Sequence, residues 1–450
     1  MEKKTHHIIQ FIGLLTVLTV ILLQGLTKVV PSKPLNAFEQ KENEPVDLSF
    51  QTYYDGSYQQ YLTNYAKQNT GFREFFIRNY NQFVYSCLHS VTNQHIKKGR
   101  NRELYLKMYL DEVTGKTLRD TYSDIDSAMA VAQRNVDETL RLVDSLHNHG
   151  TQFLFVFAPT KTKVYPENMP RYYRKHISDF SLEEYYIDLF KEKGIPHIDF
   201  LSYFEAIKDT ITYPLYTRTG THWAASTLPF VTDSIMKKIA DLTGKDLPNI
   251  RCIEAPPTTE YTEQDGELEG KMNLLFPLNK PALPSPLTAL SDTMGKAHLN
   301  LLVVGDSHFG TLLETCFTDA FANWNFWEYN KTVISSNPDY SYVRLNDYYD
   351  AYKVLKEADI VMAVFTAPML YDYMFGFTDT AFNLYETLQC DSCIREIQIE
   401  KYKWIIRKDA GWYDAVVKQA EERGIDVEQA LRNNAEYMIF METQRDPHEE

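Results

Sequence analysis

The chain has 450 residues, enough for about three domains of ordinary size, and its composition of 44% hydrophobic and 24% charged residues is that of a folded globular protein. Wholesale disorder is therefore excluded. Its 46 basic and 61 acidic residues give a net charge of −15, which argues against nucleic acid as the main partner because phosphate binding needs clustered Lys and Arg.

The first predicted element is a membrane anchor. Residues 8–26 form a run of nineteen residues without a charge, and about twenty apolar residues match the hydrocarbon core of a bilayer. Lys3 and Lys4 precede the run, so we expect the main part of the chain to lie outside the cytoplasm, on the periplasmic side. The following TKVVPSKP offers no small-residue cleavage site. We therefore expect an uncleaved signal anchor over residues 1–30 and a polar, Pro-containing linker over 31–49.

Residues 50–390 show helix and strand signals in alternation. Helical signals cover 58–84, with a break at Gly71, then 127–147, 181–192 and 226–242, and a further helix is expected from Thr311. A hairpin is expected over 96–109, and buried strands over the short apolar runs 153–158, 196–200, 299–304 and 358–365. This alternation predicts an α/β fold with a mainly parallel sheet covered by helices on both faces.

Two stretches depart from this pattern. Residues 256–286 contain six prolines without a clear period, which is typical of an inserted loop, either a lid or substrate rim or a plain surface excursion. Residues 391–450 are charged and amphipathic, with helices expected at 394–407, 412–423 and 427–439 and no strand signal. We expect this tail to pack as a small helical appendix.

Cysteine and tyrosine usage leave alternatives open. Five cysteines are too few for a disulfide scaffold, and nothing around Cys390 and Cys393 resembles a redox unit, so a short disulfide loop or inert thiols are favoured. No metal or cofactor is expected, since no second Cys or His pair has zinc-ligand spacing. The 31 tyrosines suit either a carbohydrate site or sheet packing. For the Tyr-rich run 339–352, a helix packed on the sheet is favoured over sugar-stacking rings.

The strand 299–304 is followed by Gly305-Asp306-Ser307-His308. A serine at such a turn lies at the carboxyl edge of the sheet, where open α/β folds place their sites. Backbone N–H groups at a helix N-terminus favour a developing oxyanion, and a hydroxyl there becomes a nucleophile when a base is near. The alternative is an ordinary helix N-cap.

A second segment carries the candidate base. His222 and Trp223 follow Thr221 at the start of the helix expected over 226–242. An imidazole in this position suits a general base. The alternative is that both rings only fill the core at the helix entry.

Taken together, the two segments resemble the SGNH hydrolase-like family of the alginate O-acetyltransferases AlgJ and AlgX, also called DHHW-type proteins. Further similar segments are 72–76, Gly99 with 104–105, 150–166 and 267–277. The resemblance runs over about residues 45–370. It implies an SGNH-like three-layer fold for residues 50–390, between the N-terminal anchor helix and the C-terminal helical tail.

The resemblance implies that Ser307 is the nucleophile and His222 its base. The family's third member is an Asp two residues before the His, but here that position is Gly220, which cannot orient an imidazole. A Ser–His dyad with a backbone carbonyl or water on the other ring nitrogen is one alternative. The other is a carboxylate from elsewhere in the chain, which the sequence does not name.

Other residues near the motifs have expected roles. His308 is interpreted as a helix-cap or surface residue, and Thr366-Ala367 replaces an acidic pair expected near the later strand. Lys163 and Tyr165 follow a strand and are candidates for substrate contact, although Lys163 suits a solvated surface charge equally. The residues expected to support the site are Gly305, Asp306, Thr221 and Trp223, with Asp306 bracing the turn.

The resemblance implies an extracytoplasmic O-acetyltransferase that modifies a secreted or cell-surface polysaccharide. Ser307 would carry the acetyl group as an acyl-enzyme, and the N–H groups of Ser307 and a neighbouring glycine would hold the oxyanion. A membrane-bound O-acyltransferase would supply the acetyl group, and an acceptor water would make the protein an esterase. The alternative is a catalytically weak glycan-binding scaffold, because the motif Asp is missing.

Overall fold

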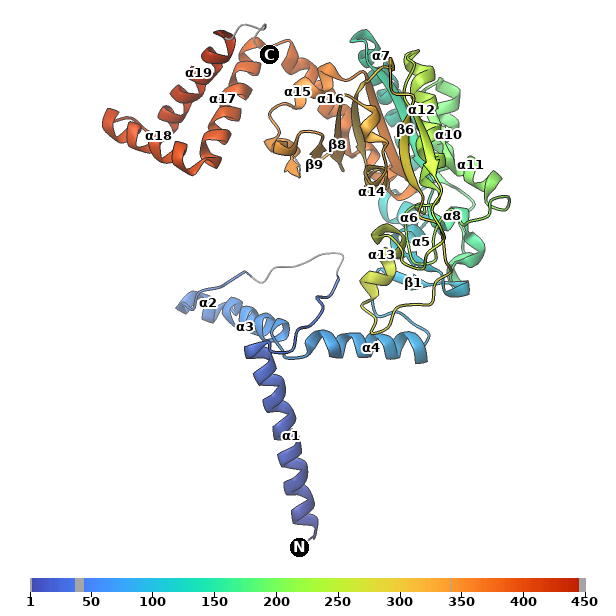
Figure 1. The fold of residues 1–450 in the computed structure, drawn as a ribbon, viewed down its shortest axis with the longest axis vertical. Coiled ribbons are helices and arrows are strands. Elements are labelled where there is room, and N and C mark those ends of the chain that lie inside the picture. Colours follow the sequence, from blue (N-terminus) through green and yellow to red (C-terminus); the bar gives the residue numbers. More distant parts are fainter. Residues whose placement is uncertain (1, 37–43, 341, 445–450) are drawn as a thin grey trace.

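The computed structural model describes residues 2–36, 44–340 and 342–444, so parts of the expected anchor, linker and tail segments lie outside the described residues. A sheet domain lies between two helical ends (Figure 1). At one end α1 (Glu2–Thr27) projects away from the domain, and at the other α17 (Asp391–Lys408), α18 (Ala410–Arg423) and α19 (Val427–Gln444) form a separate group.

The central sheet has seven strands in the order β10-β9-β8-β7-β11-β3-β4. Strands β7, β8, β11, β3 and β4 are parallel, whereas β9 and β10 are added in antiparallel fashion at one edge. Their bounds are β3 (Gln152–Ala158), β4 (His197–Asp199), β7 (Asn300–Gly305), β8 (Asn323–Glu328), β9 (Thr332–Ser335), β10 (Val343–Arg344) and β11 (Ile360–Thr366). The predicted α/β class with a mainly parallel sheet is confirmed.

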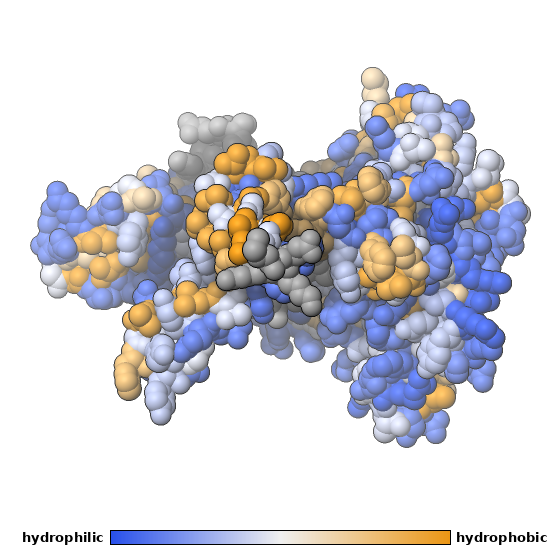
Figure 2. All heavy atoms as spheres, turned by 90° about the horizontal axis from the view of Figure 1, so that it is seen from below, coloured by the Kyte–Doolittle hydropathy of each residue, from blue (hydrophilic) through white to orange (hydrophobic). Residues whose placement is uncertain are grey.

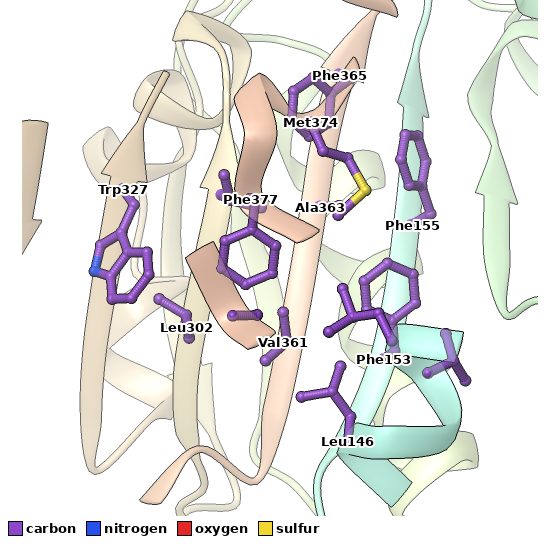
Figure 3. Close-up of a cluster of buried hydrophobic side chains, with 14 of the residues drawn as sticks. Leu146, Phe153, Phe155, Leu302, Trp327, Val361, Ala363, Phe365, Met374 and Phe377 are labelled. Carbon is purple, nitrogen blue, oxygen red and sulfur yellow. The ribbon is translucent and has the colours of Figure 1, made fainter. Parts of the chain in front are cut away.

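Alternation along the strands gives the sheet one hydrophobic core on each face. Phe153, Phe155 and Phe157 of β3 pack into one core, which Figure 3 shows, and Leu154 and Val156 into the other. Burying each such side chain contributes roughly 1.5–3 kcal/mol. The α-helices whose residues join the first core are α7 (Ile125–Asn148), α10 (Leu182–Lys193), α15 (Ala351–Glu357) and α16 (Phe377–Leu388). The longer helices of the second core are α11 (Phe200–Ile207) and α12 (Leu228–Thr243). The three-layer arrangement is therefore as predicted.

The N-terminal region consists of helices and one hairpin. The helical signal over 58–84 is divided at Gly71, as predicted. Its helices are α3 (Ser57–Gln68) and α4 (Arg73–Cys87), and a short helix that was not predicted, α2 (Phe50–Tyr54), precedes them. The expected hairpin is β1 (Ile96–Lys98) with β2 (Leu104–Leu106), followed by α5 (Lys107–Val113) and α6 (Lys116–Thr121). In α1, Thr5–Thr27 is long and apolar enough to cross a membrane and none of it is buried.

The Pro-rich segment 256–286 contains more structure than a loop. Strands β5 (Asn249–Ile253) and β6 (Leu287–Ser291) pair antiparallel at its base, and α13 (Glu263–Met272) lies within it. Thr262 caps α13 by accepting a hydrogen bond from the Asp265 N–H. The segment therefore presents a helix to the rest of the domain.

Two predictions about elements after β7 are wrong. The helix expected from Thr311 is replaced by α14 (Ser307–Gly310) and a 3₁₀ turn, Thr311–Glu314. The hydroxyls of Thr311 and Thr315 donate to nearby carbonyl oxygens, which competes with helix propagation. The described residues of the run 339–352 form short turns, β10 and the start of α15 rather than one helix. Tyr340, Tyr348 and Tyr352 are buried, so these rings serve packing.

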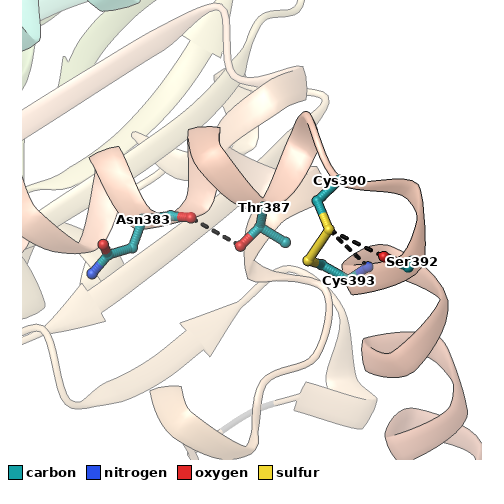
Figure 4. Close-up of a disulfide and its surroundings, with 5 residues drawn as sticks. All are labelled: Asn383, Thr387, Cys390, Ser392 and Cys393. Carbon is teal, nitrogen blue, oxygen red and sulfur yellow. Dashed lines mark hydrogen bonds between the residues drawn. A yellow bond between two sulfur atoms is a disulfide. The ribbon is translucent and has the colours of Figure 1, made fainter.

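The C-terminal helices have hydrophobic contacts of their own. Ile406, Val416 and Leu431 bring α17, α18 and α19 together. A disulfide joins Cys390 to Cys393 at the start of α17 (Figure 4). Of the alternatives left open by the sequence, the structure has the short disulfide loop.

Candidate active site

Ser307 lies where the central strand β7 ends. The strand stops at Gly305, and Ser307 is the first residue of α14 at the carboxyl edge of the sheet. A Cβ on Gly305 would lie 2.5 Å from the Val364 carbonyl oxygen of neighbouring β11, so only glycine lets the two backbones come this close. The tight turn therefore fixes where the Ser307 hydroxyl is presented.

Asp306 holds this turn from inside the protein. One carboxylate oxygen accepts the His308 N–H at 2.9 Å, and the other accepts the N–H and hydroxyl of Thr366 at 2.8 and 2.7 Å. Burial raises the pKa of Asp306, but these donors and the His308 ring outweigh it, so the pKa is lowered. Asp306 is thus an ionised brace, and Thr366 supplies the polar contact at the position where an acidic pair was expected.

His222 faces the nucleophile. Its Nε2 lies 2.9 Å from the Ser307 Oγ, a hydrogen-bond distance, although the residues are 85 positions apart. Both Thr221 and His222 are buried, and the Trp223 indole N–H donates to the Thr311 hydroxyl at 2.5 Å. The contact of Trp223 ties the His222 segment to the turn after Ser307.

The carboxylate missing from the motif comes from the Pro-rich segment. Glu267 of α13 places its Oε2 3.0 Å from the other ring nitrogen of His222, Nδ1. The contact has the distance of an ion pair but not the alignment of a hydrogen bond; such contacts often tighten only when substrate binds. Burial raises the pKa of Glu267, but His222 and Lys271 outweigh it and lower the pKa to about 2, so the side chain is a carboxylate at neutral pH.

Gly220 is the reason that α13 can reach His222. A Cβ at this position would lie 2.8 Å from the Gln264 carbonyl oxygen and from the Thr217 hydroxyl, closer than real Cβ contacts allow. The Asp265 carbonyl oxygen accepts the hydroxyls of Thr217 and Thr219 at 2.5 and 2.9 Å. The close packing of α13 on this segment thus leaves no room for an Asp side chain at position 220, and it also places Glu267 beside His222.

The buried Lys161 also supports the segment that leads to His222. Lys161 Nζ lies 2.7 Å from Glu103 and donates to the carbonyl oxygens of Leu104 and Thr217 at 3.0 and 2.6 Å. Because the charge is paired and hydrogen-bonded, its burial is tolerated. Lys161 therefore holds the chain that leads to His222.

The interpretation of His308 as a cap or surface residue is wrong. The side chain is fully buried, and its ring centroid lies 4.7 Å from that of His222 and 5.4 Å from that of Trp223. Burial lowers the pKa of His308 more than the neighbouring Asp306 raises it, so the ring is neutral. The helix cap is Asp306 instead.

Tyr329 is a site residue that the sequence did not reveal. It follows β8, and Ser307 lies close enough to its phenol to influence the phenol's pKa. Burial raises the pKa of Tyr329, so the phenol stays protonated and can donate. Its location one residue beyond a parallel strand was the available signal, but β8 has the mixed sequence NWNFWE and was not predicted.

The two residues expected to contact substrate have internal partners instead. Lys163 is buried, 3.0 Å from Glu183, and its ammonium also donates to the Ser181 hydroxyl. The Tyr165 hydroxyl accepts the Leu215 N–H at 3.0 Å. Both groups are used to hold the fold together, because they follow β3 in a turn covered by other elements.

A large cavity adjoins the site next to Glu267. Its volume is about 910 Å³, and its lining includes Glu267 and Lys271 of α13, Arg78 of α4 and Lys33 beyond α1. Glu267 therefore separates the buried His222 from a polar cavity that leads toward the N-terminal helices. Within the described residues, no group of three or more His, Cys, Asp or Glu side chains is placed to hold a metal ion.

Comparisons with known proteins match part of the chain to one family model. Residues 119–301 match the family model of the SGNH hydrolase-like domain of acetyltransferase AlgX. The resemblance to the AlgJ and AlgX family is confirmed for this segment. The segment includes His222 and Glu267 and ends before Ser307. None of the curated proteins matches the chain significantly in sequence.

Solved structures are similar at low sequence identity. The O-acetyltransferase domain of Pseudomonas putida AlgJ is 15% identical with a TM-score of 0.41, covering 63% of this chain and 99% of that chain. AlgX of Pseudomonas aeruginosa is 14% identical with a TM-score of 0.40, covering 63% and 67%. PatB1 of Bacillus cereus is 13% identical with a TM-score of 0.35, covering 55% and 93%. A shared activity does not follow from similarity at this level.

Proposed function

We propose that this protein is a membrane-anchored, extracytoplasmic O-acetyltransferase that acts on a secreted or cell-surface polysaccharide. The observation that carries the proposal is the line of contacts from Ser307 Oγ to His222 Nε2, at 2.9 Å, and from His222 Nδ1 to Glu267, at 3.0 Å. Nucleophile, base and orienting acid in this order are the arrangement used for acyl transfer. The match of residues 119–301 to an acetyltransferase domain supports the same reaction class.

The first half-reaction forms an acyl-enzyme. Ser307 Oγ attacks the carbonyl carbon of the acetyl donor while its proton passes to His222 Nε2. The resulting oxyanion would be held by the Ser307 N–H and the Tyr329 phenol, two donors beside the nucleophile. The tetrahedral intermediate collapses, the donor's leaving oxygen takes the proton from His222, and the acetyl ester on Ser307 remains.

The second half-reaction transfers the acetyl group to sugar. A sugar hydroxyl gives its proton to His222 Nε2 as its oxygen attacks the acetyl ester. Collapse of this intermediate releases the acetylated sugar, and Ser307 Oγ recovers the proton from His222. In both halves the carboxylate of Glu267 stabilises the imidazolium that forms.

The surroundings of the domain support a place outside the cytoplasm. An apolar N-terminal helix and a disulfide between Cys390 and Cys393 fit an oxidising compartment. A membrane-bound O-acyltransferase that exports acetyl groups would supply the donor. The scaffold alternative depended on the missing motif acid, and the contact of Glu267 with His222 removes that reason.

The test uses the purified full chain in detergent. It should release p-nitrophenol from p-nitrophenyl acetate, and with an oligosaccharide present it should yield acetylated sugar by mass spectrometry. Ser307→Ala should abolish both signals, whereas Ser234→Ala, at a half-buried serine of α12, should retain them. Equal activity of Ser307→Ala and the wild type would overturn the proposal, and hydrolysis without sugar transfer would make the protein an esterase.

A further inference from the structure

The helices next to α1 expose an unusual number of aromatic rings. Among the large side chains of α3 and α4 that are half exposed or more are Tyr65 (52%), Phe75 (52%), Tyr80 (63%) and Phe83 (55%). Water-exposed surfaces rarely gather large apolar groups in this way unless they bind something. Figure 2 views the molecule from the side on which α1 projects and shows hydrophobic side chains around and beside this helix.

On α4 the exposed rings form a stripe. Phe76, Tyr80, Phe83 and Cys87 are spaced four, three and four residues apart, which places them on one helix face. The opposite side faces the domain, where the Asn81 amide donates to the Met272 carbonyl oxygen of α13 at 2.9 Å. The stripe therefore points away from the protein.

The contact of the α3–α4 junction with α1 indicates how deep the exposed rings would lie in a membrane. A Cβ on Gly25 would lie 2.5 Å from the Asn69 carbonyl oxygen, and a Cβ on Gly71 would overlap the Ile21 carbonyl oxygen. With a rise of about 1.5 Å per residue, Gly25 and Ile21 lie only about 3 and 9 Å before the end of α1 at Thr27. If α1 spans a bilayer, the α3–α4 junction therefore lies at the boundary between headgroups and acyl chains.

The charge and the residue types of α3 and α4 also fit a location at the membrane interface. Residues 57–88 contain three basic side chains and one acidic one, in a chain whose net charge is −15. Tyr and Phe are suited to the interface because their rings are apolar, and the Tyr hydroxyl can also hydrogen-bond to water. Helices with an apolar face and basic flanks lie in the plane of the membrane surface.

We propose that α3 and α4 lie on the lipid surface, with the stripe Phe76, Tyr80, Phe83 and Cys87 inserted at the headgroup boundary. The helices run across the direction of α1 (Figure 1), so anchor and stripe together fix the height and tilt of the domain. Arg78 of α4 donates to the Leu274 carbonyl oxygen, and the Asn81 amide donates to the carbonyl oxygens of Met272 and Asn273, all in the chain that follows Glu267. The membrane surface thus supports the segment that carries the triad acid.

The native thiol of Cys87 tests this placement. Cys252 and Cys316 are replaced by Ser in the full chain, a nitroxide label is attached to Cys87, and the protein is reconstituted in nanodiscs of phosphatidylcholine with and without phosphatidylglycerol. The label should collide more with oxygen, which concentrates in lipid, than with a water-soluble nickel complex. The matched control carries the label on Cys252, which is also exposed, after Cys87→Ser and Cys316→Ser, and should show the reverse.

The outcomes separate lipid from other partners. A Cys87 label as open to the nickel complex as the Cys252 label would place the stripe in water and overturn the proposal. Protection from both oxygen and nickel would indicate contact with a second copy of the chain and would overturn it too. Phe76→Ser with Phe83→Ser should move the Cys87 label toward the aqueous pattern.

Discussion

At the residue scale, the site shows that an orienting acid need not come from the motif that carries the base. His222 needs a carboxylate at Nδ1, and Glu267 places one 3.0 Å away although it lies forty-five positions later in the sequence. Lys271, one helical turn on, contacts the other oxygen of Glu267 at 2.7 Å. Together with His222, that ion pair lowers the pKa of Glu267 and keeps the group ionised.

Glu267→Gln should lower kcat by about a hundredfold to ten-thousandfold, since removing the acid of a triad leaves the imidazolium without its stabilising charge. The measurement is acetyl release from p-nitrophenyl acetate, with KM expected to change little. The control is Glu269→Gln on the same helix, where the carboxylate pairs with Lys280 instead. Equal losses in both variants would mean that α13 acts only as a structural support.

At the element scale, the close approach of α13 to the His222 segment makes the site. Two threonine hydroxyls and the Thr219 carbonyl oxygen, which accepts the Leu268 N–H at 2.9 Å, fasten the helix. Neither part is in the sheet, so the triad depends on two peripheral segments that pack against each other above its edge. We expect a single added carbon atom between α13 and the His222 segment to disturb their packing.

Gly220→Ala should reduce kcat by about tenfold to a hundredfold, because a displacement near 1 Å of a catalytic group has effects of this size. The added Cβ would meet the Gln264 carbonyl oxygen at 2.8 Å and push α13 away. The matched control is Gly266→Ala on α13, where the nearest atom to the new Cβ would be 3.9 Å away, and it should keep full activity. Unchanged activity of Gly220→Ala would show that α13 tolerates the shift.

The docking of α13 should also respond to pH through Asp265. Burial raises the pKa of its carboxyl to about 6. A raised pKa in the folded state means that this group's stabilising contribution is complete below about pH 4 and is lost as pH rises through about 6. Asp265→Asn stays neutral and keeps an acceptor for the Ala225 N–H. It should raise the stability at pH 8 by about 3 kcal/mol and leave it unchanged at pH 4, as measured by the shift in Tm. An equal gain at both pH values would contradict this account.

At the scale of the whole molecule, three parts have separate tasks. The helices α1 to α4 set the position at the membrane, the sheet domain carries the site, and α17 to α19 form a group with hydrophobic contacts of their own. The cavity lined by Glu267, Arg78 and Lys33 lies where the first two parts meet. Changes in how the domain sits on the membrane would therefore reach the acid of the triad first.

An extracytoplasmic location predicts the redox state of the cysteines in cells. If iodoacetamide is added before lysis and the chain is then digested, Cys390 and Cys393 should be found joined and unmodified, because the two form a disulfide. Exposed Cys252, a free thiol, should be alkylated and serves as the internal control. Alkylated Cys390 in unreduced protein would place the domain in a reducing compartment.

Much of the framework follows from local sequence. The runs 153–158, 299–304 and 358–365 are continuous and apolar because β3, β7 and β11 are buried on both faces. Strands β8 to β10 were missed because they lie toward one edge and mix polar with aromatic residues. Ser307 was identifiable because its strand, glycine turn and helix start are contiguous in the chain.

The sequence by itself determined the α/β class, the apolar N-terminal helix, the C-terminal helices and the pairing of Ser307 with His222 as candidates. Only the tertiary structure decided which acid completes the site. Segment 256–286 offers several carboxylates within one helix, Glu263, Asp265, Glu267 and Glu269, and no local pattern distinguishes them. The choice depends on how α13 rotates and docks over Gly220, which is set by contacts between residues distant in the chain.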